Sequence, residues 1–190
     1  MTLIAPPPKK RHIQMTLFVD ASFCPKTKAA GWAAWAKSDL YDRGYYFGDL
    51  VTIGEPQTSS QAELMGIAHA CRVLADHNEF EKLDSVVLQC DSLDALQVIW
   101  KNVPSANVAR KKDSGRDIKW LHYLKIAPNV ATSVLLIQGV FKTIPVWLRH
   151  VKGHEKGVTG RSHVNETCDK IAKRHMNEER QRRYALECRS

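Results

Sequence analysis

The feature that most restricts the fold is a series of three β-prone segments near the start of the chain, joined by short links. The segments cover residues 14–19, 29–37 and 45–53, and the link SDLYDRG before the third consists of polar and turn-forming residues. Consecutive strands with links this short pair as antiparallel neighbours. The first part of the chain therefore predicts an antiparallel meander of three strands.

Helical and extended patterns alternate after the meander. Residues 58–77 carry apolar side chains at helical spacing behind serines that can cap a helix. Residues 85–90 form an apolar run too short for a helix, and a helical pattern over 92–100 follows Asp91. A strand reached through a helical crossover lies parallel to its neighbour, so the sheet is predicted to be mixed.

The last third contains one more strand pattern. Residues 102–116 are polar and basic and indicate an exposed connection, whereas residues 146–151 predict a fifth strand. The pattern after Pro128 favours a helix that stops before Pro145, although VLLIQ within it also fits a strand. The other predicted pieces are a helix over 117–126, a mobile glycine-rich loop over 152–162 and a last helix from about residue 163. This order predicts an α/β fold: a five-stranded mixed sheet flanked by helices.

The length and the composition predict one folded domain. With 190 residues, 44% of them hydrophobic and 25% charged, the chain is long enough for one core, and no apolar run approaches the roughly 20 residues that cross a bilayer. We expect a flexible proline-rich basic tail over 1–12, a domain over 13–178, and a charged helix end or tail over 179–190. We also expect a monomer that does not bind membranes.

The cysteines and the net charge indicate the compartment and the partner. The five cysteines are odd in number and show no CxxC spacing, which favours a reducing compartment, here the cytoplasm. A net charge of +8 indicates a polyanionic partner such as nucleic acid, because Lys and Arg that neutralise phosphates release counterions.

Two acidic residues are predicted at the ends of buried strands, where a charged carboxylate is energetically unfavourable. Asp20 follows QMTLFV and Asp91 follows SVVLQC. Glu63 and Asp169 lie within helical patterns, close to apolar positions. Carboxylates that gather in one place raise each other's pKa unless a cation compensates, and a divalent metal ion is the simplest such cation.

Four motifs in this order resemble type 1 ribonuclease H. They are FVDAS, TSSQAELMGIAHA, LQCDSLDAL, and WLRHVKGH together with NETCDKIA, and the resemblance covers residues 13–176. It implies a ribonuclease H-like fold and an endonuclease that hydrolyses the RNA strand of RNA–DNA hybrids, leaving 5′-phosphate and 3′-hydroxyl ends. It implies Asp20, Glu63, Asp91 and Asp169 as ligands of two Mg²⁺ ions, for which Mn²⁺ can substitute, and His154 as a group that moves protons or aids product release.

The same resemblance implies contacts with the substrate. Arg110, Lys111 and Lys112 match a basic handle that grips the duplex, and Thr58 matches a residue that holds a phosphate of the DNA strand. The remaining expected substrate contacts are Ser22, Ser59, Ser60 and Asn165. The chain departs from the family pattern at Ala21, where glycine is usual, and at the two serines after Thr58, where amide side chains are usual, so selectivity for hybrids could be relaxed.

Two other functions stay open on the sequence alone. One is a nuclease of the same fold that acts on structured DNA or on double-stranded RNA; proofreading exonucleases usually carry Asp-x-Glu in the first strand, where this chain has Asp20, Ala21 and Ser22. The other is a non-catalytic nucleic-acid-binding module, which would tend to lose metal ligands. Taken alone, Asp91 would more often be a helix cap and Glu63 a first-turn acid favoured by the helix dipole.

Overall fold

The computed structural model describes residues 12–108, 127–151 and 160–188. The expected amino-terminal tail up to residue 11 and the helix expected over 117–126 lie outside the described residues. Most of the glycine-rich loop, over 152–159, lies outside them as well. None of the described helices has the length and the apolar character needed to cross a membrane.

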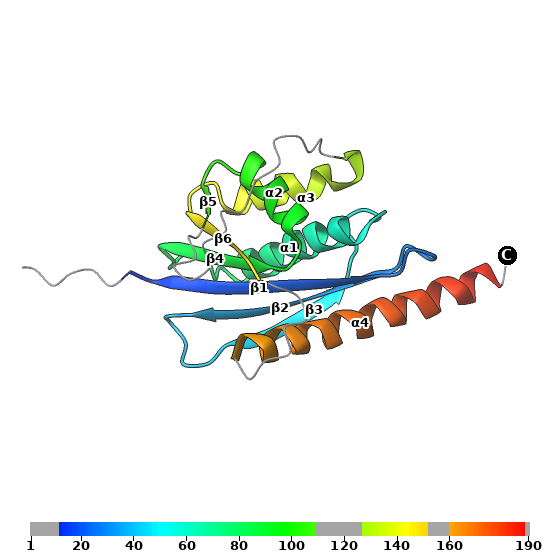
Figure 1. Ribbon diagram of the computed structural model, residues 1–190. Coiled ribbons are helices and arrows are strands. Elements are labelled where there is room, and N and C mark those ends of the chain that lie inside the picture. The colour runs from blue at the N-terminus through cyan, green and yellow to red at the C-terminus, as the bar shows by residue number, and fades with distance from the viewer. Residues whose placement is uncertain (1–11, 109–126, 152–159, 189–190) are drawn as a thin grey trace, which may run out of the picture.

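The described part of the chain contains a six-stranded sheet and four helices (Figure 1). The strands are β1 (Gln14–Phe23), β2 (Ala30–Ser38), β3 (Tyr45–Leu50), β4 (Ser85–Cys90), β5 (Ala106–Val108) and β6 (Val146–His150). The helices are α1 (Ser59–Asp76), α2 (Leu93–Asn102), α3 (Ala131–Val140) and α4 (Gly160–Glu187), with a short 3₁₀ turn over Pro128–Val130 before α3. The segment VLLIQ is therefore helical, as part of α3.

The sheet is mixed, as predicted. Its strands follow the order β3-β2-β1-β4-β6-β5. Strands β1, β2 and β3 form the expected antiparallel meander, and β4, β5 and β6 are parallel to the strands they pair with. Strand β1 thus lies at the centre, between an antiparallel and a parallel neighbour, and residues late in β1 lie beside the residues that follow β4.

The prediction of five strands was wrong by one. Strand β5 lies within residues 102–116, which the sequence indicates as an exposed connection, and it pairs with β6 from Ala106 to Val108. Three residues between a proline and a basic run are too few to show a strand pattern. The pairing partner lies about forty residues further along the chain, so the strand depends on tertiary contact rather than on local preference.

The helices cover both faces of the sheet (Figure 1). Helices α1, α2 and α3 lie over one face, where α1 packs against β1 and α3, and α4 crosses the other face against β1, β2 and β3. The larger core lies beneath α1 and includes Trp32, which is 2% exposed and donates its indole N–H to the carbonyl of Leu50 at 3.1 Å. A smaller core around Phe18, Cys168 and Ala172 joins α4 to the sheet.

Helix α4 comes so close to the sheet that only glycine fits beneath it. A Cβ atom added to Gly31 of β2 would lie 2.5 Å from the amide nitrogen of Met176 and even closer to the carbonyl oxygen of Ala172. Both of these atoms belong to the backbone and cannot rotate away. The whole helix would have to shift to admit a side chain.

We therefore expect Gly31→Ala to destabilise the protein by about 1–3 kcal/mol, the usual cost of overpacking a core. Urea denaturation followed by circular dichroism measures this change as a lower denaturation midpoint. Gly139→Ala in α3 is the matched control, because an added Cβ there meets no atom within 4 Å and alanine favours a helix. A Gly31→Ala variant as stable as the parent would contradict the close approach of α4.

Candidate active site

Asp20 and Asp91 lie side by side where β4 ends. The prediction of a strand end at Asp20 was wrong, because residues 20–23 pair with residues 30–33 of β2 and so extend β1 to Phe23. Strands β1 and β4 are parallel with Phe18 paired to Gln89, and the same register carried two residues further brings Asp20 level with Asp91. Asp20 is 7% exposed, and Asp91 stands directly after β4. Asp91 does not cap the helix that follows, because Ser92 is the N-cap of α2 and its hydroxyl accepts a hydrogen bond from the amide of Ala95 at 3.3 Å.

Helix α1 adds a third acid, which is held by both strands. Glu63 is 6% exposed, and its Oε1 accepts a hydrogen bond from the backbone N–H of Ala21 at 3.0 Å. Its Oε2 accepts one from the Cys90 thiol at 3.6 Å. These two contacts fix the Glu63 carboxylate between Ala21 of β1 and the last residue of β4.

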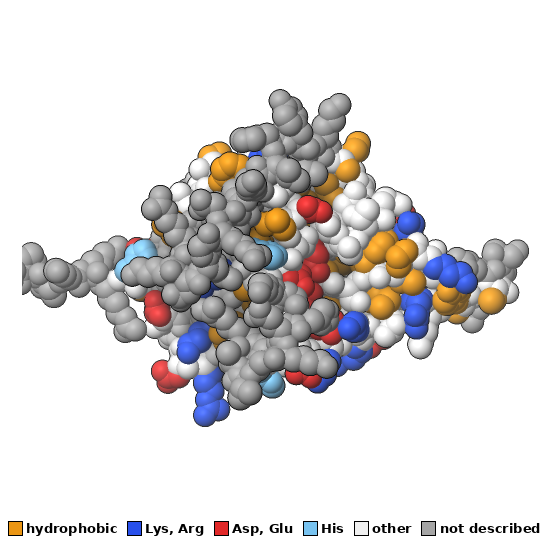
Figure 2. Space-filling model, in the orientation of Figure 1, with side chains coloured by type: hydrophobic (Ala, Val, Ile, Leu, Met, Phe, Trp, Pro, Cys, Tyr) orange, Lys and Arg blue, Asp and Glu red, His pale blue; other side chains and the backbone are white. Residues whose placement is uncertain are grey.

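The fourth acid comes from α4, on the other face of the sheet. Asp169 is close enough to Asp20 for its negative charge to raise the pKa of Asp20. The Asp169 side chain is 26% exposed, and its Oδ2 accepts a hydrogen bond from the ammonium group of Lys173 at 2.7 Å. The structure therefore brings the four sequence-predicted acids together from four different elements, and Figure 2 shows acidic side chains gathered at the centre of one face.

The acids of this cluster resist ionisation together. Burial, followed by the charges of Asp91 and Asp169, raises the pKa of Asp20 to about 7. Burial and the charges of Asp20 and Asp91 raise the pKa of Glu63 well above its usual value. Near neutral pH a fully ionised cluster is therefore unstable by itself, and a bound cation would remove this penalty.

The donor atoms of the cluster suit a hard divalent cation. Among the described residues, Glu63, Cys90 and Asp91 each offer a ligand atom, and these atoms lie within 4.8 Å of one another. Burial and the nearby Glu63 raise the pKa of the Cys90 thiol, so it serves as a hydrogen-bond donor and the carboxylates supply the anionic oxygens. Carboxylate oxygens are the ligands that Mg²⁺ and Mn²⁺ prefer.

Two residues of this site were not identified as site residues from the sequence. Cys90 links Glu63 of α1 to the amide of Ser92, which donates to its sulfur at 3.3 Å. His150 contacts the carbonyl oxygen of Asp91 through its Nε2 at 2.9 Å. The one signal in the sequence was that each residue lies at the end of a strand and within one of the four motifs.

The expected phosphate-binding segment lies at the amino end of α1. Thr58 is the N-cap of this helix, and its hydroxyl accepts a hydrogen bond from the amide of Gln61. Ser59 is exposed, and Ser60 donates its hydroxyl to Asp94 at 3.2 Å. The helix dipole places partial positive charge here, which suits a phosphate group.

Two further expected contacts lie near the acids. Ser22 is two residues after Asp20 on β1 and so points to the same face of the strand. Asn165 lies one helical turn before Asp169 on α4, and both side chains are half-buried. The other expected site residues, His154, Arg110, Lys111 and Lys112, lie outside the described residues.

Comparison with known proteins identifies one family. The family model described as RNase H matches residues 12–177. No curated protein sequence matches the chain. The matched segment contains all four acids of the cluster and almost the whole described sheet and helix framework.

Solved structures with the same fold are distant in sequence. The RNase H1 of Halobacterium salinarum is 16% identical, with a TM-score of 0.55 over 87% of this chain and 98% of that one. The N-terminal RNase H domain of a Mycobacterium tuberculosis protein is 12% identical, with a TM-score of 0.60 over 89% and 97% of the two chains. LC11-RNase H1, isolated from compost, was crystallised with an RNA/DNA hybrid and is 13% identical, with a TM-score of 0.59 over 87% and 98%.

Proposed function

The chain belongs to the RNase H family, and on that premise we propose that it is an endoribonuclease that cuts the RNA strand of RNA–DNA hybrids. The products would carry 5′-phosphate and 3′-hydroxyl ends. The observation that carries the proposal is the meeting of four acids from β1, α1, the end of β4 and α4 at one edge of the sheet. The crystal structure of LC11-RNase H1 with an RNA/DNA hybrid supports this choice of substrate.

Asp20, Glu63, Asp91 and Asp169 would hold two Mg²⁺ ions, which Mn²⁺ could replace. When bound, the two ions would supply an activated water and neutralise the developing charge on the scissile phosphate and the leaving 3′ oxygen. The chain itself keeps the ligands in place. Ala21 and Cys90 orient Glu63, and Lys173 holds Asp169.

The remaining proposed roles are substrate binding and proton transfer. Thr58, Ser59 and Ser60 would hold a phosphate at the start of α1, and Ser22 and Asn165 would contact the strand beside the acids. We propose that His154 moves a proton or aids product release, because a histidine exchanges protons near neutral pH. Arg110, Lys111 and Lys112 would bind the duplex. We also propose that the protein is a monomer and acts in the cytoplasm.

A substrate panel tests the proposal. With Mg²⁺ or Mn²⁺, we expect the protein to cut the RNA strand of a hybrid on the order of 100-fold faster than double-stranded RNA or a four-way DNA junction of the same sequence. Only the hybrid offers 2′-hydroxyls on one strand and a DNA strand opposite, so only the hybrid can make both sets of contacts. Gel analysis of end-labelled strands measures the rates and the chemistry of the new ends. Cleavage of the junction at the same rate would favour the structured-DNA nuclease, and tight binding without any cleavage would favour the non-catalytic module.

A further inference from the structure

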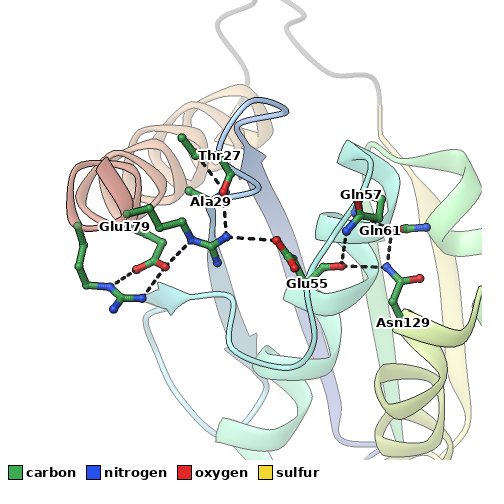
Figure 3. Close-up of polar contacts among 9 residues, drawn as sticks. Thr27, Ala29, Glu55, Gln57, Gln61, Asn129 and Glu179 are labelled. Carbon is green, nitrogen blue, oxygen red and sulfur yellow. Dashed lines mark hydrogen bonds and ion pairs between the residues drawn. The ribbon is translucent and has the colours of Figure 1, made fainter. Parts of the chain in front are cut away.

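The last turns of α4 are anchored to two loops that are distant in the sequence (Figure 3). The guanidinium group of Arg183 donates hydrogen bonds to the carbonyl oxygen of Thr27 at 2.8 Å and to the carboxylate of Glu55 at 3.3 Å. Its Nε also donates to Glu179 at 2.7 Å, and Glu179 is 5% exposed. Arg183 thus joins α4 to the β1–β2 turn and to the loop before α1.

The loop before α1 is fixed in turn by amide side chains. The carbonyl oxygen of Glu55 accepts a hydrogen bond from Asn129 at 2.9 Å, and Asn129 also donates to the side chain of Gln61 in the first turn of α1 at 2.7 Å (Figure 3). The end of α4 therefore has a defined position relative to the β1–β2 turn and to the proposed phosphate-binding segment.

One side of α4 continues from the acids to this anchored end. Lys173, Arg180 and Tyr184 follow Asp169 by 4, 11 and 15 residues, so all four positions lie within about 60° of one another around the helix axis. Arg180 is about 16 Å along the axis from Asp169. Hydrogen bonds with Thr27 lower the pKa of Cys24 most, and the Arg180 charge adds a smaller lowering, as expected for a side chain near the β1–β2 turn.

The β1–β2 turn adds two positive charges at the same place. The ammonium group of Lys26 lies 5.5 Å from the centre of the Tyr184 ring, and that of Lys28 lies 5.7 Å from the centre of the Phe23 ring. Within the described part of the chain, Lys26, Lys28 and Arg180 form no salt bridge. On the face shown in Figure 2, Lys and Arg side chains border the central acids toward the end of α4.

We propose that Lys26, Lys28 and Arg180 bind the sugar–phosphate backbone of the nucleic acid where it extends beyond the cleavage site. This inference rests on the proposed function, because it takes the acid cluster as the point of cleavage. One strand of a duplex carries a phosphate about every 3.4 Å along the axis, so 16 Å corresponds to about five phosphates. A cationic side chain that forms no salt bridge does not have to break one when it binds a phosphate. The aromatic rings beneath Lys26 and Lys28 also limit the motion of these two side chains.

The test is the salt dependence of binding. A full-length variant with Lys26→Gln, Lys28→Gln and Arg180→Gln is compared with the parent by fluorescence anisotropy on a 24-base-pair hybrid in EDTA, where metal-dependent cleavage cannot occur. We expect the dissociation constant to rise on the order of 10- to 100-fold at 0.1 M salt. The slope of the logarithm of the association constant against the logarithm of the salt concentration should become less negative by about two to three. Each lost phosphate contact lowers the magnitude of this slope by about 0.9.

Arg174→Gln is the matched control. Arg174 is also a cation of α4, with a side chain 64% exposed, but it lies about 120° around the helix from Arg180 and faces Glu178 at 4.0 Å. Its removal should leave the slope unchanged, and melting curves check that every variant is folded. Equal slopes for the triple variant and the parent would overturn the inference. Failure of the hybrid-cleavage assay alone would overturn the proposed function and leave this binding result standing.

Discussion

Asp91→Asn is expected to abolish hydrolysis while the protein still binds its substrate. The substitution keeps the volume of the side chain and removes one of the charges that would hold the divalent cations. We expect a loss of at least about 10³-fold in the single-turnover rate, because the cations that Asp91 would hold supply the charge stabilisation of the transition state. Cleavage of an end-labelled hybrid with Mg²⁺ measures the rate, and anisotropy measures the affinity, which should change little.

Asp76→Asn controls for the loss of one negative charge. Asp76 ends α1, its side chain is 67% exposed, and it pairs only loosely with Arg72 at 3.8 Å. It lies outside the cluster, so this variant should cut at the rate of the parent. If the Asp91→Asn protein turned over normally, the acid cluster would not be the catalytic centre, whatever the family of the chain.

The acids could be located from the sequence because their signals are local. Asp20 and Asp91 each follow a short apolar run; Asp91 stands directly after β4, whereas Asp20 lies inside β1, three residues before its end. Glu63 lies four residues before Ile67, which is 0% exposed, so its burial also follows from helical periodicity. The convergence of these residues then follows from the parallel pairing of β1 and β4.

The contacts around the acids could not be predicted, because they join segments that no local pattern connects. Cys90 contacts Glu63 only because α1, which packs on β1, carries Glu63 to the end of β4. An apolar run does not reveal that its last thiol will donate to a carboxylate. The charged segment 179–190 predicts a solvated helix end or tail. In the structure α4 continues to Glu187, and Arg183 reaches Thr27 and Glu55, which are 156 and 128 residues away in the sequence.

Asp20→Asn is expected to stabilise the protein in the absence of divalent cations, most strongly above pH 7. The pKa of Asp20 is about 7 in the folded protein and near 3.8 when unfolded, because burial and then Asp91 and Asp169 disfavour its charge. Between these two values the folded state binds more protons than the unfolded state. The free energy of unfolding therefore falls as pH rises from about 4 to 7, and the full penalty persists at higher pH.

Asparagine carries no charge to desolvate, so this penalty disappears in the variant. At 1.36 kcal/mol per pKa unit the gain is at most about 4 kcal/mol, and each kcal/mol corresponds to roughly 2–4 °C in Tm for a chain of this size. Thermal melts in EDTA at pH 5 and pH 8 measure the difference in Tm between the variant and the parent, which should be larger at pH 8.

Added Mg²⁺ should raise the Tm of the parent and narrow the gap at pH 8, because a cation that binds only the folded state stabilises it by mass action. Asp76→Asn, which removes a charge from the surface, should show no such gap at either pH. Two results would show that the four acids do not destabilise the folded state. One is a parent protein whose stability in EDTA increases between pH 5 and pH 8, and the other is an Asp20→Asn variant that melts below the parent at pH 8. A confirmed gap would mean that the chain keeps a destabilising cluster in place, which is the physical reason to regard the cluster as a site for cations rather than as part of the framework.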